Sequence, residues 1–165
     1  IERFIPARKG RRHILKLVSS LVSHQPQSKK TNIEKSLSYV SNIIKKRSVI
    51  FILSDFYNQD FAKPLKILKR RHDVIAIKVN DSREAEIPDI GLIQLEDEET
   101  GEQLLVDTSN QSFRKNYAKL VNKEEMRLSH LFNKNKVDII NISTDMPYEF
   151  PLRKFFKIRQ TRGVR

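Results

Sequence analysis

Apolar residues recur along this sequence in two patterns, one typical of amphipathic helices and one typical of buried strands. Spacings of three and four residues predict helices at Arg11 to Ser23, Thr31 to Lys46, around Phe61, Leu65, Ile67 and Leu68, at Gln111 to Asn133, and after Pro147. Unbroken β-branched and aromatic runs predict strands at Ser48–Ser54, His72–Val79 and Val137–Ile142. Ile1–Pro6 is typical of the end of a further strand.

The strand runs do not alternate between apolar and polar residues, which is typical of strands covered by helices on both faces. Strands that are separated by helices lie parallel in one sheet and are joined by right-handed crossovers. We therefore expect an α/β fold, a doubly wound, mostly parallel sheet with helices on both faces. We expect one domain over residues 1–165. Because the chain begins with Ile1 and not with Met, we expect a piece of a longer protein, with the first strands missing.

Two short apolar segments, Leu92–Leu95 and Gln103–Val106, flank an acidic turn at Glu98–Gly101. A turn that contains glycine between two such segments predicts a β-hairpin. The tip of this hairpin would carry negative charge.

Charged residues are distributed unevenly along the chain, and the excess of basic residues indicates which kinds of partner to expect. The formal net charge is +12, with +10 over residues 1–50, −6 over residues 51–107 and +8 over residues 108–165. A basic balance favours a polyanionic partner such as nucleic acid, an acidic lipid surface or an acidic protein. Solvated basic faces explain it equally well. Cysteine is absent, which excludes thiol catalysis and cysteine–zinc sites and is compatible with the cytoplasmic location that we expect.

Asp55 is the first candidate for chemistry, because it directly follows the most hydrophobic predicted strand. Ligands of open α/β sheets bind at the carboxyl ends of the strands. An acid there has one desolvated side and one open side, which suits a metal ion or a phosphoryl group. Asp55 could instead cap the N-terminus of the following helix.

Thr31 is the second candidate. It stands where a helix N-cap belongs, with Glu34 three residues later, the spacing of a capping box. The helix that it opens leads into the strand before Asp55, so a tight crossover would bring Thr31 near the same edge of the sheet. Its hydroxyl could ligate a hard cation there, or it could act only as the cap.

The sequence lacks several enzyme signatures. It contains no Gly-x-x-x-x-Gly-Lys-Ser/Thr loop and no Gly-x-Ser-x-Gly elbow, and only 4 glycines occur. The four histidines lack metal-binding spacing, and we expect all of them at the surface. Asp55 also lacks the second acid of an Asp-x-Asp phosphotransferase pair. We therefore expect no catalytic residues.

Three basic segments, Arg8–Arg12, Lys45–Arg47 and Lys69–Arg71, could line a groove for a polyanion. No stacking aromatic residues are interleaved with them, so we expect no specific nucleic-acid binding. Basic residues at helix C-termini are also expected from the helix dipole. Polyanion binding through these basic helices stays open as an alternative.

Eight segments, in order along nearly the whole chain, resemble one protein family. They are Ile1–Leu15, Lys30–Leu37, Phe51–Phe56, Arg71–Ile77, Pro88–Leu92, Glu99–Glu102, Val106–Ser109, and Val137-Asp138 with Ser143-Thr144-Asp145. The family they resemble is a widespread bacterial one of unknown function, whose von Willebrand factor A-like members are commonly encoded beside MoxR-type AAA+ ATPases. The resemblance implies a doubly wound, Rossmann-type α/β domain, in agreement with the patterns above.

The resemblance also implies a metal-ion-dependent adhesion site at the carboxyl edge of the sheet. In this superfamily the site uses an Asp-x-Ser-x-Ser loop, a Thr before a helix and an Asp after a later strand, and the last two match Thr31 and Asp55. The loop has no match here, and Phe56 replaces the usual glycine after the Asp. The resemblance implies Mg²⁺ in a full-length protein. Because a divalent cation takes about six oxygens, we expect weak or no metal binding by this chain.

We therefore expect a non-enzymatic protein-interaction domain that acts with a MoxR-type AAA+ ATPase in assembly or chaperone work. A phosphoryl-transfer or hydrolytic enzyme that uses Asp55 is the main alternative. The resemblance places the missing first strand beside Val49–Leu53, so we expect oligomerisation or strand exchange through that exposed edge. The hairpin region Asp81–Glu102 and the basic helices are the expected partner surfaces, and no membrane span is expected.

Overall fold

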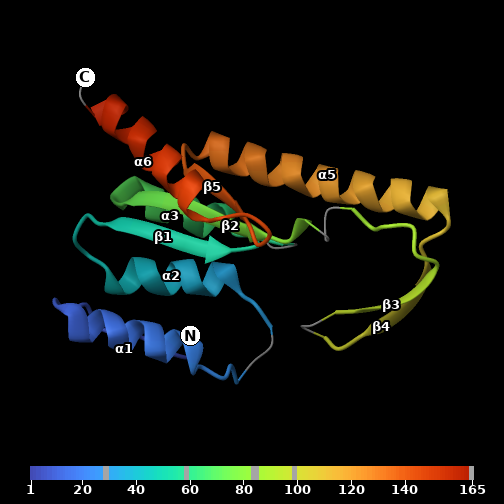
Figure 1. The fold of residues 1–165 in the computed structure, drawn as a ribbon. Helices are drawn as coiled ribbons and strands as arrows, with labels where there is room; N and C mark the ends of the chain where they lie inside the picture. Colours follow the sequence, from blue (N-terminus) through green and yellow to red (C-terminus); the bar gives the residue numbers. More distant parts are fainter. Residues whose placement is uncertain (28–29, 58–59, 83–85, 98–99, 164–165) are drawn as a thin grey trace.

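The computed structural model of the chain describes residues 1–27, 30–57, 60–82, 86–97 and 100–163 (Figure 1). Its elements, in chain order, are α1 (Arg11–Val22), α2 (Ile33–Ile43), β1 (Val49–Ser54), α3 (Ala62–Arg71), β2 (Asp73–Asn80), β3 (Leu92–Glu96), β4 (Gln103–Asp107), α5 (Gln111–Lys134), β5 (Asp138–Ser143) and α6 (Glu149–Gly163). Each helix and strand expected beyond residue 10 has a counterpart within a few residues, and the α/β class is confirmed. None of the described helices has both the length and the apolar character needed to cross a membrane.

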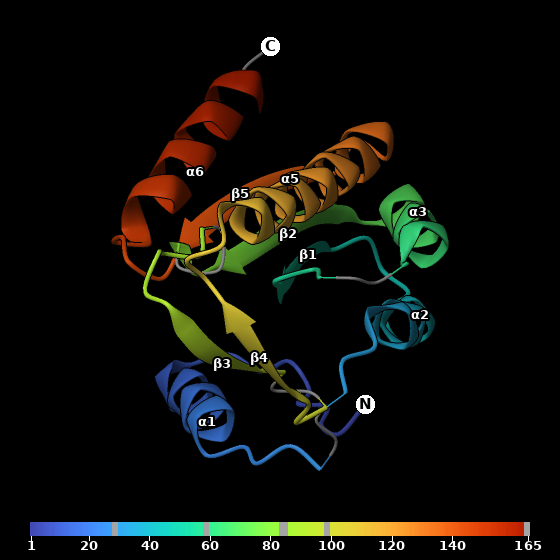
Figure 2. The ribbon, with the colours of Figure 1, turned by 90° about the vertical axis from the view of Figure 1, so that its right-hand side faces the viewer.

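Three parallel strands form the central sheet in the order β1-β2-β5. Val49 pairs with Asp73 at the start of β1 and β2, and Ile75 pairs with Asp138 where β2 and β5 begin to run together. Residues of α2, α3 and α5 pack on one face of the sheet, and residues of α6 pack on the other (Figure 2). The parallel sheet flanked by helices is therefore confirmed.

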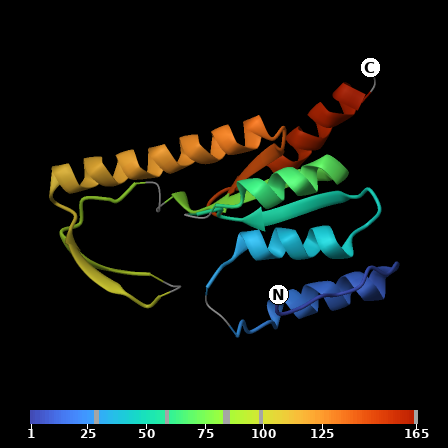
Figure 3. The same ribbon diagram turned by 180° about the vertical axis from the view of Figure 1, so that it is seen from behind.

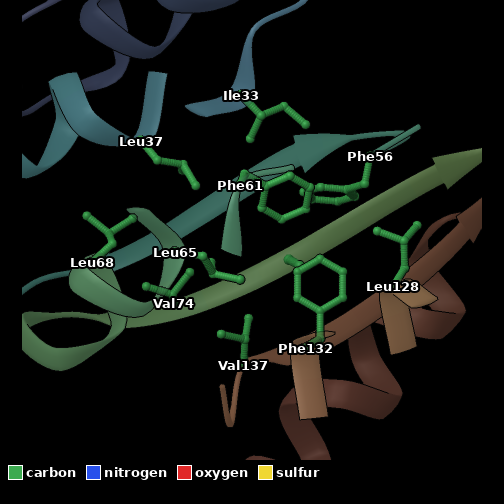
Figure 4. Packing of buried hydrophobic residues seen from close by; sticks show 11 residues of the cluster. Ile33, Leu37, Phe56, Phe61, Leu65, Leu68, Val74, Leu128, Phe132 and Val137 are labelled. Carbon is green, nitrogen blue, oxygen red and sulfur yellow. The ribbon is translucent and has the colours of Figure 1, made fainter. Parts of the chain in front are cut away.

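The main hydrophobic core lies between the sheet and helices α2, α3 and α5 (Figure 4). Its buried members are Ile33, Leu37, Phe56, Phe61, Leu65, Leu68, Val74, Ala76, Leu128, Phe132 and Val137. At its centre Phe56, Phe61 and Phe132 contact one another, with ring centroids 5.2 to 6.1 Å apart. Such ring pairs add about 0.5–1.5 kcal/mol each beyond the burial of their area. The core thus fixes the turn after β1 against α3 and α5.

β1 has one covered face and one open face, which corrects the expectation that it is buried on both. Ile50 and Ile52 pack against the main core, whereas Val49, Phe51 and Leu53 are 57%, 42% and 66% exposed. The reason is that β1 is the edge strand of the described sheet, and that α6 lies over β2 and β5 and reaches β1 through a ring contact with Phe51. A continuous apolar run does not tell an edge strand from a central one.

The segment before α1 forms no strand, so the strand end predicted at Ile1–Pro6 is wrong. It runs beside α1 instead (Figure 3). Arg3 Nη1 donates a hydrogen bond to the Ser20 carbonyl (3.4 Å), and the Phe4 ring packs edge-on against Tyr39 of α2. Because α1 lies away from the sheet, most of its apolar side chains stay exposed (Figures 1 and 2). The exposed apolar residues of α1 are Ile14, Leu15, Val18, Leu21 and Val22.

β3 and β4 form the predicted antiparallel hairpin, with Leu92 opposite Asp107. The hairpin projects from the end of the body toward which the three parallel strands run (Figures 1 and 3). Glu98 and Glu99 of the predicted acidic tip lie outside the described residues.

Candidate functional site

The carboxyl ends of the parallel strands bring polar residues from distant parts of the chain to one edge of the sheet. β1 ends at Ser54, β2 at Asn80 and β5 at Ser143. Beyond the strand ends, the Thr144 N–H donates to the Asn80 carbonyl (3.0 Å), so β2 and β5 remain hydrogen-bonded there. Ligands of open α/β sheets bind at this kind of edge.

Asp55 follows β1 directly and is exposed. Its Oδ1 accepts hydrogen bonds from the Tyr57 N–H (3.1 Å) and the Ser54 hydroxyl (3.2 Å), and that hydroxyl accepts one from the Phe56 N–H (3.0 Å). The turn is therefore closed by its own side chains. Phe61 is the N-cap of α3, so the alternative that Asp55 caps this helix is wrong.

Phe56 turns the chain sharply after Asp55. Its φ is 59°, in the left-handed region that glycine favours. This conformation costs about 1–2 kcal/mol for a residue with a Cβ, and burial of the phenyl ring, which is 0% exposed, offsets that cost. The turn thus holds a non-glycine residue in a conformation that glycine adopts without strain.

Thr31 lies one residue before the N-cap of α2, which corrects the predicted capping box. The cap is Asn32, whose Oδ1 accepts a hydrogen bond from the Lys35 N–H (2.8 Å). Asparagine is as good an N-cap as threonine or better, and with this cap Glu34 stands one residue too early to close the box. Thr31 itself is exposed.

The structure brings the segments that carry Thr31 and Asp55 to the same end of the body. The N-terminal end of α2 and the C-terminal end of β1 lie together at this end in two opposite views (Figures 1 and 3). Ile33, which follows Thr31 by two residues, and Phe56, next to Asp55, belong to one buried cluster (Figure 4). Joint action of Thr31 and Asp55 on one ligand stays a prediction.

The described residues at this edge do not make a complete cation site. In the part of the chain that the structure describes, no three carboxylate or imidazole side chains are placed to hold a metal ion. Mg²⁺ takes about six oxygen ligands, and Thr31 and Asp55 would supply two. One Asp55 oxygen is already engaged in the turn. A cation bound here would need further oxygens from outside the described residues.

Three ion pairs between elements that pack together were not predicted from the sequence patterns. Lys78 of β2 is buried and forms an ion pair with Glu125 of α5. Asp73, at the start of β2, pairs with Arg159 of α6 and with Lys69 of α3 (3.4 Å). A lysine within an apolar strand is a visible sequence signal. Its partner is not, because the two residues are brought together only by the packing of α5 on the sheet.

His72 is buried, so the expectation that all four histidines lie at the surface is wrong for this residue. It is the C-cap of α3, and its backbone N–H donates to the Leu68 carbonyl (3.0 Å). Within the described residues its ring nitrogens have no hydrogen-bond partner. The ring is enclosed because α3 and β2, which it joins, both pack into the core.

The base of the hairpin ties two of the resembling segments together. Thr108 is fully buried, donates its hydroxyl to the Gly91 carbonyl (2.7 Å) and accepts from the Ile90 N–H (3.0 Å). Arg114 of α5 donates to the Thr108 carbonyl and pairs with Asp89 (3.0 Å). These contacts set the direction in which the hairpin leaves the body.

Asp107, beside this junction, has an altered acidity. The Ser109 hydroxyl (2.6 Å) and the Ser109 N–H (2.9 Å) both donate to its Oδ1. These hydrogen bonds, the hydroxyl bond first, hold the pKa of Asp107 below its ordinary value because they favour the charged carboxylate. The carboxylate is exposed, so its role is in the local turn and not in the core.

Comparison with known proteins identifies the family. A sequence model described as "Protein of unknown function DUF58" matches residues 1–127. The chain belongs to the DUF58 family. The match includes Thr31, Asp55, the hairpin and more than half of α5.

Relatives of this DUF58 chain occur in mycobacteria. It is 27% identical over 165 residues to the uncharacterized protein MAV169 of Mycobacterium avium, covering 97% of this chain and 95% of that protein. It is 30% identical over 100 residues to the uncharacterized proteins Mb1516 of Mycobacterium bovis and Rv1480 of Mycobacterium tuberculosis, which is 59% of this chain and 32% of each of them. The chain thus spans nearly all of one curated relative and about a third of the others. No solved structure matches the chain.

Proposed function

We propose that this DUF58 chain is a von Willebrand factor A-like protein-interaction domain, non-enzymatic, which binds a MoxR-type AAA+ ATPase through the carboxyl edge of its sheet. The observation that carries the proposal is the setting of Asp55, an exposed carboxylate on a turn that is fixed by its own hydrogen bonds and by the buried Phe56. A charge that is already held in place loses little conformational entropy when a partner binds.

The backbone at Phe56 supports the von Willebrand factor A-like part of the proposal. Its φ of 59° is the conformation that glycine, the residue that the resemblance to the von Willebrand factor A superfamily implies at this position, adopts without strain. The parallel strand order β1-β2-β5 and the helices on both faces of the sheet are compatible with the fold that the resemblance implies.

Exposed leucines at the same end of the body supply apolar contact area for a protein partner. Leu92, Leu104 and Leu105 of the hairpin are 69%, 61% and 68% exposed, and the hairpin projects from the end at which Asp55 lies (Figure 3). Protein interfaces combine apolar anchors with charged groups around them. The hairpin and Asp55 together would form such a surface.

The contact at Asp55 would be a direct one in this chain. Since the described residues do not complete a cation site, the carboxylate would accept hydrogen bonds from a lysine or arginine of the ATPase. Asp55 Oδ2 makes no hydrogen bond within the described residues, so it can serve as the acceptor. Mg²⁺ would enter only if further ligands came from outside these residues.

Calorimetry with the purified chain and a purified MoxR-type ATPase from the same genome tests the proposal. Asp55→Asn removes the charge and keeps an oxygen that can accept from the Tyr57 N–H. We expect it to weaken binding at least tenfold, about 1.4 kcal/mol. Asp60→Asn is the matched control, because Asp60 Oδ1 also accepts a backbone N–H, that of Ala62 (3.2 Å). It should change the affinity less than twofold, and EDTA should have no effect.

Two outcomes would contradict the proposal. Equal affinities of Asp55→Asn and wild type would show that Asp55 takes no part, and no binding at all would remove the partner. The enzyme alternative makes a different prediction: with a phosphoryl donor, the wild type would gain the mass of one phosphoryl group as an acyl-phosphate, and Asp55→Asn would not.

A further inference from the structure

A basic hollow of about 200 Å³ opens at the end of the sheet opposite to Asp55, where β2 and β5 begin. It lies between the C-terminal ends of α3 and α5 and is lined by Lys66, Lys69, Arg70, Lys134, Asn135 and Lys136. We propose that these six residues, the basic pocket, bind a compact polyphosphate group. The proposal is independent of the function proposed for Asp55, because it concerns another end of the molecule and another ligand.

Most of the positive charge in the basic pocket is not neutralised by the protein. Lys69 pairs with Asp73 (3.4 Å), which also takes Arg159. Within the described residues the other four cations, Lys66, Arg70, Lys134 and Lys136, form no ion pair. The C-terminal dipole of each helix supplies about half a negative charge. The two helix ends together therefore offset about one positive charge. Of the four cations without an ion pair, an excess of about three positive charges remains to bind a ligand.

The backbone that carries these cations is fixed before any ligand binds. Lys69 and Arg70 follow Lys66 by three and four residues, so both lie beside Lys66 on one side of α3. Beyond the end of α5, the Lys136 N–H donates to the Asn133 carbonyl (3.0 Å). The Val137 N–H donates to the Phe132 carbonyl (3.0 Å) in the same turn, and both side chains are buried.

Asn135 completes this turn. Its backbone N–H (3.2 Å) and its side-chain amide (2.8 Å) both donate to the Leu131 carbonyl, which caps the last turn of α5. Leu65 and Leu68 of α3 belong to the same buried cluster as Phe132 of α5. The two groups of cations are therefore attached to one core, and their mutual repulsion does not spread the helices apart.

The shape and lining of the basic pocket favour a compact anion over a nucleic-acid strand. Polyphosphate oxygens accept hydrogen bonds from lysine, arginine and asparagine amide groups, and these are the only side chains in the lining. Single-stranded nucleic acid is usually held by stacked aromatic residues along an extended groove, and the lining contains none. A triphosphate, free or as part of a nucleotide, presents the matching chemistry.

Titration of the isotope-labelled chain with sodium triphosphate, followed by amide NMR and calorimetry, tests the proposal. We expect saturable one-to-one binding, with amide shifts concentrated at residues 66–70 and 134–136. The double variant Lys66→Gln/Lys134→Gln should bind about tenfold more weakly, since each exposed charge pair contributes about two- to fivefold. Lys63→Gln/Lys123→Gln changes two exposed lysines of the same helices that lie outside the lining, and it should bind within twofold of wild type.

The comparison of the two double variants distinguishes a specific binding site from general electrostatic attraction to a chain of net charge +12. Equal losses in both double variants, or the absence of saturable binding, would overturn the proposal. If ATP competes with triphosphate and binds with equal affinity, the pocket recognises the phosphates alone. If ATP binds more tightly than triphosphate, the pocket also contacts the nucleoside. The proposal would also be overturned if oligothymidylate bound, if this binding depended on Lys66 and Lys134, and if triphosphate did not bind. That result would favour nucleic-acid binding on this surface.

Discussion

The rings of Phe56 and Phe132 meet edge to face, with centroids 5.2 Å and planes 81° apart. Phe56 belongs to the turn that carries Asp55, and Phe132 lies two residues before Lys134 of the basic pocket. One aromatic contact in the core therefore supports both proposed binding regions, although they lie at opposite ends of the sheet. Loss of this contact should disturb both.

At Phe56 we expect substitution by glycine to lower the stability less than substitution by alanine, the reverse of the usual order. Phe56→Ala should lower the free energy of unfolding by about 3–5 kcal/mol, as for other buried phenylalanines. Phe56→Gly removes even more atoms, yet it should be less destabilising by up to about 1 kcal/mol, because glycine relieves the strain at φ 59°. Urea denaturation of both variants measures the difference. If the glycine variant were the less stable of the two, the backbone at this position would not be strained as described.

Ser109→Ala should raise the pKa of Asp107 toward its ordinary value of 3.8, because it removes the hydroxyl that contributes most to the lowered pKa. A carboxyl whose pKa is lower in the folded state stabilises that state above its unfolded pKa. This contribution is lost as the pH falls through the folded value. Ser109→Ala should therefore destabilise the chain at neutral pH and match wild type well below pH 3.8. Carboxyl NMR titration reports the pKa, and Ser129→Ala on α5 should leave it unchanged.

The open face of β1 should make the chain self-associate. Leu53→Lys places a charge on this edge strand and should shift the chain toward monomer in light scattering coupled to gel filtration. The change in stability should stay within about 0.5 kcal/mol, since Leu53 is 66% exposed. Leu120→Lys on α5 is the control, because Leu120 is 64% exposed and does not lie on the sheet. A wild type that is monomeric at all concentrations would refute the prediction.

Local patterns in the sequence were sufficient to predict the helices and strands beyond residue 10, but not the course of Ile1–Pro6. Val74 to Ile77 form a buried stretch of β2, and the apolar spacing along Gln111–Lys134 gives a long helix. The hairpin also follows from its flanking segments and its turn. These features depend on residues close together in the chain, where periodicity and turn chemistry act.

Features set by distant neighbours could not be predicted in this way. The exposure of Val49 and Leu53 depends on which strand lies beside β1, and the pairing of Lys78 with Glu125 depends on how α5 crosses the sheet. The choice of Asn32 over Thr31 as N-cap is a different case. Both residue types cap helices well, so the residue types alone do not fix a boundary that differs by one residue.

The two candidate regions differ in how far the sequence indicated them. Asp55 was marked by its place after an apolar strand and by the family resemblance. The basic pocket was visible only as the run Lys69–Arg71, which the helix dipole explains equally well. Lys134 and Lys136 join it because parallel strands bring the C-terminal ends of α3 and α5 to the same end of the sheet.

The position of α6 has a consequence for biosynthesis. Synthesis proceeds from the N-terminus, so the main core can assemble as soon as β5 has emerged from the ribosome. Ile75, Ile77 and Ile140 face the other way and are covered by Leu152 and Phe155 of α6. The apolar residues on that side of the sheet stay exposed to solvent until the last described helix has been translated. During this interval we expect the nascent chain to be prone to aggregation and to bind chaperones.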